Sequence, residues 1–202
     1  MKKEERIKKT FPWGTLFAAR ENFEFGYFTK EKELVDKYLT RPSDVLVLGS
    51  GNGREAFPIH ANGHSIVCID NVTIYLDAGR LLCKKRGIDN VTFKEMDVTQ
   101  PWPFQDEAFD FIFFSIFSYI GDRRWHALQE ARRVMRGAGY TLLSTATSLY
   151  PQRHPRSLHS EYLFFDNVDS IQNAVDPIGF RVLDGGVDPK RHEYLFVILA
   201  RN

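Results

Sequence analysis

Residues 45–53 read Val-Leu-Val-Leu-Gly-Ser-Gly-Asn-Gly and decide the fold. The four apolar residues predict a buried strand, and the three glycines at alternate positions predict the tight turn that follows it. Glycine has no Cβ, so the backbone N–H groups of such a turn can approach a ligand closely. A second apolar run ends at Asp70, seventeen residues past Gly53. A strand, a glycine turn, a helix, a second strand and an acid form the layout of a nucleotide site in an open parallel sheet.

The composition fits one soluble domain of 202 residues, with 43% hydrophobic and 26% charged residues. The net charge is +1, so no overall field steers the protein toward nucleic acid or a membrane. The 17 phenylalanines predict either aromatic pocket walls or, more simply, a phenylalanine-rich core. Cys68 and Cys83 form no disulfide or metal pattern, so we expect a reducing environment and no metal site. The charged first residues lack the apolar stretch of a signal peptide, and we expect a cytoplasmic protein.

Strand and helix patterns alternate along most of the chain. Residues 1–28 predict an arm rich in aromatic side chains, and residues 29–202 predict a single domain. Serial strand–helix units with buried strands predict a parallel sheet covered on both faces, and the last two strands predict a terminal antiparallel hairpin. We expect strands over residues 45–48, 65–69, 91–96, 109–114, 140–146, 180–183 and 194–200. We expect helices over residues 31–39, 54–61, 73–86, 123–135 and 168–175, with Thr29 as the N-cap of the first helix. Residues 150–165 are expected to form a loop.

Over roughly residues 30–202 the sequence resembles the class I S-adenosylmethionine-dependent methyltransferases. The resemblance implies an α/β fold, a doubly wound and Rossmann-like, mostly parallel sheet of seven strands in the order 3-2-1-4-5-7-6, with strand 7 antiparallel and helices on both faces. It also implies S-adenosyl-L-methionine as cofactor. The order and spacing that carry it are the glycine turn 49–53, Asp70, Glu95-Met96-Asp97-Val98, Phe109-Asp110-Phe111-Ile112, the segment 130–139 (Glu-Ala-Arg-Arg-Val-Met-Arg-Gly-Ala-Gly) and the terminal hairpin.

The resemblance places the cofactor at the carboxyl ends of the strands. Asp70 would accept both ribose hydroxyls, because a carboxylate has two acceptor oxygens; a helix N-cap or a surface acid is the alternative. Asp97 would accept the adenine amino group; turn chemistry before Thr99 is the alternative. Arg20 and Arg54 are candidates for the methionine carboxylate, with surface salt bridges as the simpler interpretation. The expected cofactor-binding residues are Gly49, Ser50, Gly51, Gly53, Asp70, Asn71, Val72, Asp97, Val98 and Ser115.

A dinucleotide enzyme is the competing interpretation of the glycine turn. Its fingerprint is G-x-G-x-x-G, whereas this turn reads G-x-G-x-G and is followed by Arg54 and Glu55. An acid at Glu55 would also repel a pyrophosphate at the start of the helix. Both points favour S-adenosylmethionine over a dinucleotide.

Methyl transfer from a sulfonium needs alignment and exclusion of water more than a fixed catalytic group. We expect the acceptor pocket above the fourth and fifth strands, under the arm, with Tyr119 and His159 as candidates for a polar or proton-accepting catalytic role. Arm-to-core packing is the simpler interpretation for most of the candidate lining residues, which are Trp13, Phe17, Tyr27, Phe28, Phe117, Tyr119, Tyr150, His154, His159 and Tyr162.

The expected function is methyl transfer to a small-molecule acceptor. Residues 114–117 read Phe-Ser-Ile-Phe and depart from the Asn/Asp-Pro-Pro-Tyr-like pattern that marks methylation of amino groups in nucleic bases or glutamine. One alternative is an RNA or protein methyltransferase, which basic clusters such as 84–86 and 132–136 would favour. Another is a non-catalytic S-adenosylmethionine-binding protein. We expect no membrane partner, a nucleic-acid partner is less favoured, and the oligomeric state stays open.

Overall fold

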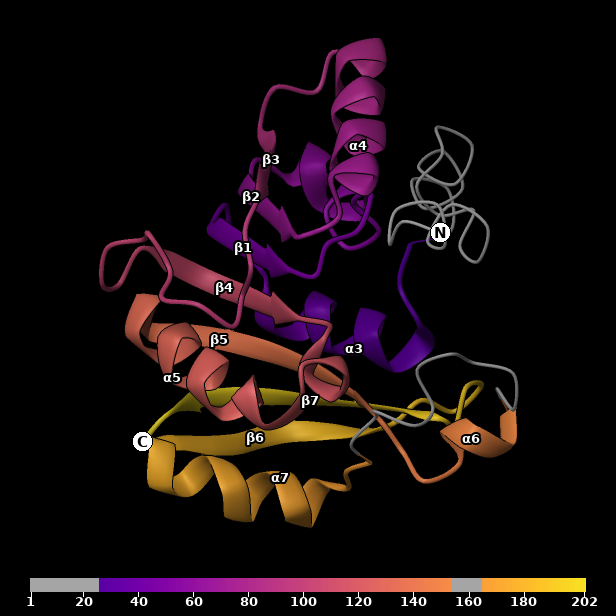
Figure 1. Cartoon of the computed structure of the whole chain (residues 1–202), viewed down its shortest axis with the longest axis vertical. Helices are drawn as coiled ribbons and strands as arrows, with labels where there is room; N and C mark the ends of the chain where they lie inside the picture. The colour runs from indigo at the N-terminus through magenta and orange to yellow at the C-terminus, as the bar shows by residue number, and fades with distance from the viewer. Residues whose placement is uncertain (1–25, 154–164) are drawn as a thin grey trace, which may run out of the picture.

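A computed structural model of the chain, which describes residues 26–153 and 165–202, contains one seven-stranded sheet in the order β3-β2-β1-β4-β5-β7-β6 (Figure 1). β1 to β5 run parallel, and β7 lies antiparallel between β5 and β6. This order confirms the predicted α/β fold and the terminal hairpin. The strands are β1 (Asp44–Leu48), β2 (Ser65–Asp70), β3 (Val91–Glu95), β4 (Phe109–Phe114), β5 (Met135–Ala146), β6 (Phe180–Val187) and β7 (Tyr194–Arg201).

Helices cover both faces of the sheet. α3 (Thr29–Tyr38), the 3₁₀-helix η2 (Phe57–Asn62) and α4 (Thr73–Arg86) pack on one face, and α5 (Arg124–Val134) and α7 (Val168–Val175) pack on the other (Figure 1). No helix among the described residues combines the length and apolar character needed to cross a bilayer. The remaining short helices are η3 (Phe117–Tyr119), η4 (Gly121–Arg123), α6 (Tyr150–Arg153) and η5 (Asp176–Ile178).

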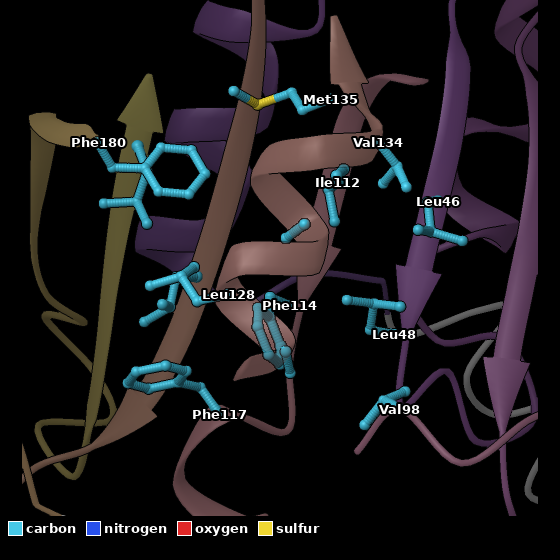
Figure 2. Close-up of a cluster of buried hydrophobic side chains, with 14 of the residues drawn as sticks. Leu46, Leu48, Val98, Ile112, Phe114, Phe117, Leu128, Val134, Met135 and Phe180 are labelled. Atoms are coloured by element: carbon cyan, nitrogen blue, oxygen red, sulfur yellow. The ribbon is translucent and has the colours of Figure 1, made fainter. Parts of the chain in front are cut away.

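Successive strand residues enter two different cores. Val47 of β1 and Phe113 of β4 join the core under α3 and α4. Their neighbours Leu48 and Phe114 join the core under α5 and α7, where Figure 2 shows Phe114 between Leu128 of α5 and Leu48. Because both faces are buried, the strands read as continuous apolar runs rather than as alternating patterns. The phenylalanine-rich core is confirmed by seven rings that are at most 2% exposed: Phe57, Phe111, Phe113, Phe114, Phe117, Phe180 and Phe196.

The helix expected over residues 54–61 is wrong. Turns follow β1, and only the short 3₁₀-helix η2 forms before Gly63 ends it with a φ of 77°. Pro58 in its first turn has no N–H and cannot make the i to i−4 bond that would continue an α-helix. The first helix also starts earlier than expected, at Thr29, so its N-cap is Phe28.

The boundary between the 123–135 helix and the fifth strand was also misplaced. β5 starts at Met135, which pairs with Phe109, and its register shifts before Tyr140 pairs with Phe111. Gly139 lies within β5, and a Cβ there would lie 2.8 Å from the Asp110 carbonyl oxygen. The glycine therefore permits a close strand approach. Residues 150–153, expected within a loop, form α6.

His64, at the entrance to β2, gives stability a pH dependence. The residue is only 2% exposed, and the Nδ1 atom of its side chain has no hydrogen-bond partner among the described residues. Burial lowers the pKa of His64 below its usual value, because the charged form loses its hydration. Below the unfolded pKa of about 6.5 the unfolded chain therefore binds more protons than the folded chain, and stability falls.

We expect the free energy of unfolding to drop between pH 7.5 and 5.5, with His64 contributing at most about 1.4 kcal/mol per pH unit. Urea unfolding at several pH values measures this slope. His64→Leu should flatten it, whereas His126→Gln, on the exposed side of α5, should leave it unchanged. Equal slopes for wild type and His64→Leu would show that His64 is not the group responsible.

Candidate functional site

The turn after β1 lies beside the switch point of the sheet, where β1 has β2 on one side and β4 on the other. Gly49, Gly51 and Gly53 all have positive φ values, of 70°, 53° and 103°. A Cβ on Gly49 would lie 2.0 Å from Cγ2 of Ile116, and one on Gly53 would lie 2.9 Å from the ring of Phe57. These two glycines are therefore required by packing within the protein as well as by the backbone conformation.

Gly51 differs from its two neighbours. A Cβ at this position would meet no atom of the described residues within 4 Å. The protein needs a glycine here only for its φ of 53°, and the space beside the backbone is open. That open space is where a ligand could approach the turn, so Gly51 meets the requirement that the sequence pattern predicted for a cofactor.

Asp70 ties this turn to the start of α4. Its Oδ2 accepts the Gly51 N–H and its Oδ1 accepts the Val72 N–H, each at 2.9 Å. Burial raises the pKa of Asp70, and the backbone N–H bonds oppose that rise. A carboxylate has about four acceptor positions, so Asp70 keeps acceptor capacity beyond these backbone bonds. The contact with ribose stays a prediction, and the helix-start role is present in addition. Asn71 beside it is exposed.

Asp97 follows β3 and is exposed. Its Oδ1 accepts both the backbone N–H and the hydroxyl of Thr99, at 2.9 and 2.7 Å. These two bonds lower the pKa of Asp97. The turn chemistry weighed as the alternative is therefore present, and the contact with adenine stays a prediction. Val98 is buried in the core under α5, where its carbonyl accepts the Trp102 indole N–H at 2.9 Å.

A cavity of about 230 Å³ lies at the carboxyl ends of β1, β4 and β5. It brings together five of the residues named from the sequence: Phe28, Gly49, Arg54, Ser115 and Tyr119. Asp70 and Asp97 do not line it, so the predicted adenosine contacts and the cavity lie in different parts of the site. Its full lining is Phe28, Gly49, Arg54, Glu55, Ser115, Ser118, Tyr119, Ser144, Thr145, Ala146, Tyr194 and Phe196.

One wall of this cavity is backed by a buried group of three charges, which we call the Arg54 triad: Glu31, Arg54 and Glu55. The Arg54 guanidinium donates to both oxygens of Glu31, at 2.7 and 3.0 Å, and to Glu55 at 2.5 Å. Burial alone would lower the pKa of Arg54, but the two glutamates raise it above its usual value. Because two carboxylates already hold this guanidinium, the triad does not favour Arg54 as the clamp for a methionine carboxylate.

The aromatic candidates divide into cavity and core residues. Phe28 lines the cavity, with its ring 4.9 Å from that of Tyr194. Tyr27 instead stacks on Phe113 at 5.9 Å, and its hydroxyl donates to the Glu55 carbonyl at 2.7 Å, which is the arm-to-core packing considered above. Phe117 is buried in the core under α5. The candidates Trp13, Phe17, Arg20, His154, His159 and Tyr162 lie outside the described residues.

Tyr119 lines the cavity and is 40% exposed as a residue. Loss of hydration around its hydroxyl, and the neighbouring Tyr150 hydroxyl to which it is hydrogen-bonded, raise its pKa above the usual value. Tyr119 therefore remains a neutral phenol at neutral pH. This favours a hydrogen-bonding role over a proton-accepting one, and its catalytic role stays a prediction.

Sequence reasoning missed the polar floor of the cavity. Ser118, Ser144 and Thr145 supply hydroxyl groups there, and Glu31 supplies the buried acid behind the wall. Serine and threonine at the end of a strand carry no signal of their own. Glu31 stood in an ordinary amphipathic helix, 23 residues from its partner Arg54.

Gly51→Ala should distinguish the role of the glycine turn 49–53 in cofactor binding from its role in folding. The new methyl group meets no protein atom, so we expect only about 1–2 kcal/mol of destabilisation from the left-handed backbone conformation. It would occupy the open space beside the turn, so affinity for S-adenosylhomocysteine should fall about five- to tenfold by calorimetry.

Gly87→Ala is the matched control, because Gly87 ends α4 with a φ of 66° and equally open surroundings. It should lose similar stability and keep full affinity. Equal affinities in the two variants would remove Gly51 from the cofactor site.

Comparison with known proteins agrees with this geometry. Residues 45–139 match a family model described as a methyltransferase domain, and this range contains the glycine turn, Asp70 and Asp97. None of the curated proteins matches the sequence.

Solved structures share the fold at low identity. A protein from Pyrococcus horikoshii OT3 superposes with a TM-score of 0.76 at 18% identity, over 98% of this chain and 99% of that chain. A chain from the complex between the Haloferax volcanii Trm112 methyltransferase activator and a methyltransferase gives 0.75 at 14% identity, over 94% and 96%. The Burkholderia thailandensis 1,6-didemethyltoxoflavin-N1-methyltransferase, with bound 1,6-didemethyltoxoflavin and S-adenosylhomocysteine, gives 0.69 at 18% identity, over 94% and 80%. Residues 45–139 of the chain thus match the methyltransferase domain, and its strand order is the fold of solved S-adenosylmethionine-dependent methyltransferases, one of them with bound S-adenosylhomocysteine.

Proposed function

We propose that this protein transfers a methyl group from S-adenosylmethionine to a small molecule held in the cavity at the ends of β1, β4 and β5. The observation that carries the proposal is the position of this cavity of about 230 Å³, which is bounded by Gly49 of the cofactor turn and by Ser115 after β4. Its volume lies below the range of about 300–1,000 Å³ that is typical of ligand pockets, and it therefore suits only a compact acceptor.

The proposed cofactor pose uses both halves of the site. Asp70 accepts the ribose hydroxyls, Asp97 and the Val98 N–H receive the adenine, and Asn71 and Val72 flank the nucleoside. The turn at 49–53 lies under the amino acid end, with a carbonyl near Ser115 for its ammonium group. The Arg54 triad has two acids and one base, and a net negative charge beside the cavity favours a cation in it.

The chain then has two tasks in the reaction. The bound cofactor supplies an activated methyl group on a sulfonium, so the protein must align the acceptor in line with it and exclude water. At the cavity wall the ring of Phe28 contacts those of Tyr194 and Phe196, and the three rings supply the apolar part of this enclosure.

The arrangement of the basic residues favours a small molecule over RNA. Arg133 is paired with Glu130 and Asp106, and Arg136 is paired with Asp44 and Asp110. Guanidinium groups engaged in this way are less available for phosphates.

The neighbours speak for both acceptor classes. The Burkholderia neighbour is named for a small-molecule acceptor, whereas the Haloferax complex contains a methyltransferase activator, which keeps a protein partner and a macromolecular acceptor as the second candidate. For location we propose the cytoplasm, with which the buried free thiols of Cys68 and Cys83 are consistent.

Calorimetry with S-adenosylmethionine and S-adenosylhomocysteine tests the cofactor, and tritiated methyl transfer into a cell extract tests the acceptor. We expect both ligands to bind and the label to enter the small-molecule fraction. Label in the RNA or protein fraction would select the second candidate. Binding without any transfer would indicate a non-catalytic protein, and absence of binding would contradict the proposal as a whole.

A further inference from the structure

A chain of buried polar groups leads away from the floor of the cavity. The Ser118 and Thr145 hydroxyl oxygens, both at the cavity, lie 2.6 Å apart. Thr145 Oγ1 donates to Oδ2 of Asp166 at 2.8 Å. Ser118 is 1% exposed, Thr145 is 3% exposed and the Asp166 side chain is 6% exposed. We call these three residues the Ser118 chain.

The direction of each hydrogen bond in the Ser118 chain follows from its ends. A carboxylate only accepts, so the single Thr145 hydroxyl proton is committed to Asp166. Thr145 must then accept from Ser118. Ser118 Oγ also accepts the Ala146 N–H at 2.8 Å, and a hydroxyl oxygen has two lone pairs. One lone pair of Ser118 therefore remains for a donor in the cavity.

Arg124 pairs with the carboxylate at the far end of the chain. Its Nη1 donates to the same Asp166 oxygen at 2.9 Å, and the guanidinium lies over the rings of Phe117 and Trp125, at 4.9 and 4.4 Å from their centroids. Arg124 is only 8% exposed. Burying such a pair is costly, and an apolar pair of similar size would fill this space at less cost. The Ser118 chain therefore ends at a buried carboxylate, and a carboxylate oxygen can accept a proton passed along the two hydroxyls.

We propose that the Ser118 chain is a proton relay and that the methyl acceptor is a hydroxyl compound whose proton it removes. This inference rests on the proposed function and assigns the class of its substrate. An amine can keep its proton in the methylated product and release it later in water. A hydroxyl oxygen becomes a strong acid as it is methylated, so it needs a base within reach at that moment.

The step balances in atoms and electrons. A lone pair of the acceptor oxygen forms the new oxygen–carbon bond, and the methyl–sulfur bond breaks with its electron pair left on sulfur. The acceptor proton passes to Ser118 Oγ, the Ser118 proton passes to Thr145 Oγ1, and the Thr145 proton passes to Asp166 Oδ2. The products are a methyl ether or ester, a neutral sulfide and a protonated Asp166. Arg124, left beside an uncharged acid, favours return of the proton along the same path to water once the product has left.

The same contacts also join secondary-structure elements, because Ser118 lies in η3, Thr145 lies in β5, and Phe165 forms a bridge to Ala146. A test of the relay must therefore measure more than folding. Thr145→Val removes the middle hydroxyl at nearly constant volume and leaves the pair between Asp166 and Arg124 in place. Thr145→Ser restores the hydroxyl and is the matched control.

The assay uses tritiated S-adenosylmethionine and a panel of small phenols and hydroxy acids. Thr145→Val should lower kcat about 100-fold at neutral pH, with unchanged cofactor affinity by calorimetry, and Thr145→Ser should recover most of it. The wild-type kcat should be flat with pH near neutrality. In Thr145→Val, kcat should rise tenfold per pH unit toward the pKa of the acceptor, because only the ionised acceptor then reacts.

Three results would overturn the relay: a Thr145→Val variant with wild-type kcat, one whose kcat is lowered equally at every pH, or a protein that binds the cofactor but methylates no hydroxyl compound of the panel. Failure to bind the cofactor would instead overturn the proposed function, and the relay with it. If Thr145→Val does not fold by circular dichroism, Ser118→Ala takes its place with the same expectations, because it removes the hydroxyl at the cavity end of the chain and leaves the pair between Asp166 and Arg124 intact.

Discussion

Replacing Arg54 by methionine is expected to destabilise the protein by about 3 kcal/mol. The change leaves Glu31, which is 0% exposed, and Glu55, which is 2% exposed, without their shared counter-ion. Breaking a buried ion pair from one side strands an uncompensated charge, and that costs about 3–5 kcal/mol. The lower end applies because the Arg54 side chain is 24% exposed. Urea unfolding at pH 7 measures the loss.

Arg136→Met is the matched control for this prediction. Arg136 also bridges two carboxylates, those of Asp44 and Asp110, but its side chain is 39% exposed and the Asp44 side chain is 47% exposed. We expect less than about 1 kcal/mol there. Equal losses in the free energy of unfolding of the two variants would show that the Arg54 triad stabilises the protein no more than an exposed ion pair does.

The effect of pH supplies a second check on the Arg54 triad. Burial raises the pKa of Glu31 against the opposing effect of Arg54. Without Arg54, the pKa of Glu31 in the folded protein rises further above its unfolded value of about 4.3. The stability that protonated Glu31 contributes is then greatest at low pH and is lost as pH rises through the folded pKa. The deficit of Arg54→Met relative to wild type should therefore shrink between pH 7 and pH 5. A deficit that stays constant would mean that lost packing, rather than stranded charge, explains the instability.

Arg54 also shows why part of the site was beyond reach of the sequence. Its neighbour Glu55 was interpreted as an obstacle to a pyrophosphate, but the partner that decides the role of Arg54 is Glu31, in α3. Tertiary contacts between distant charges leave no local pattern. The same holds for the Ser118 chain, which joins η3, β5 and Asp166 through three ordinary polar residues.

The sheet was predictable because its strands are buried on both faces and its turns contain glycine. In the apolar runs 45–48 and 109–114, successive side chains enter the two cores on opposite faces of the sheet. Both runs are therefore continuously apolar, and this pattern is unambiguous. The misplaced boundaries arose where a glycine or a proline is compatible with more than one local structure. Gly139 permits a close approach of β5 to β4, and Pro58 tightens a helical pattern into a 3₁₀ turn.

Asp70→Ala is expected to weaken binding of S-adenosylhomocysteine about 10- to 100-fold, or about 1.5–3 kcal/mol, because hydrogen bonds to a charged group are lost. Calorimetry on the folded variant measures this loss. Asp77→Ala is the control, since Asp77 lies on the exposed side of α4 and pairs only locally with Arg80 at 2.8 Å. Unchanged affinity in folded Asp70→Ala would remove this carboxylate from the cofactor site.

The bonds from Gly51 and Val72 to Asp70 create an ambiguity that this loss alone does not resolve. Asp70→Ala could weaken binding by loosening the turn rather than by losing the ribose. A 2′-deoxy analogue of S-adenosylhomocysteine separates the two causes through a double-mutant cycle. If the carboxylate contacts the ribose diol, the analogue should bind wild type more weakly than the parent compound does, and Asp70→Ala should no longer distinguish them. If Asp70 only shapes the turn, the analogue should lose the same factor in both proteins, and the ribose must be held elsewhere.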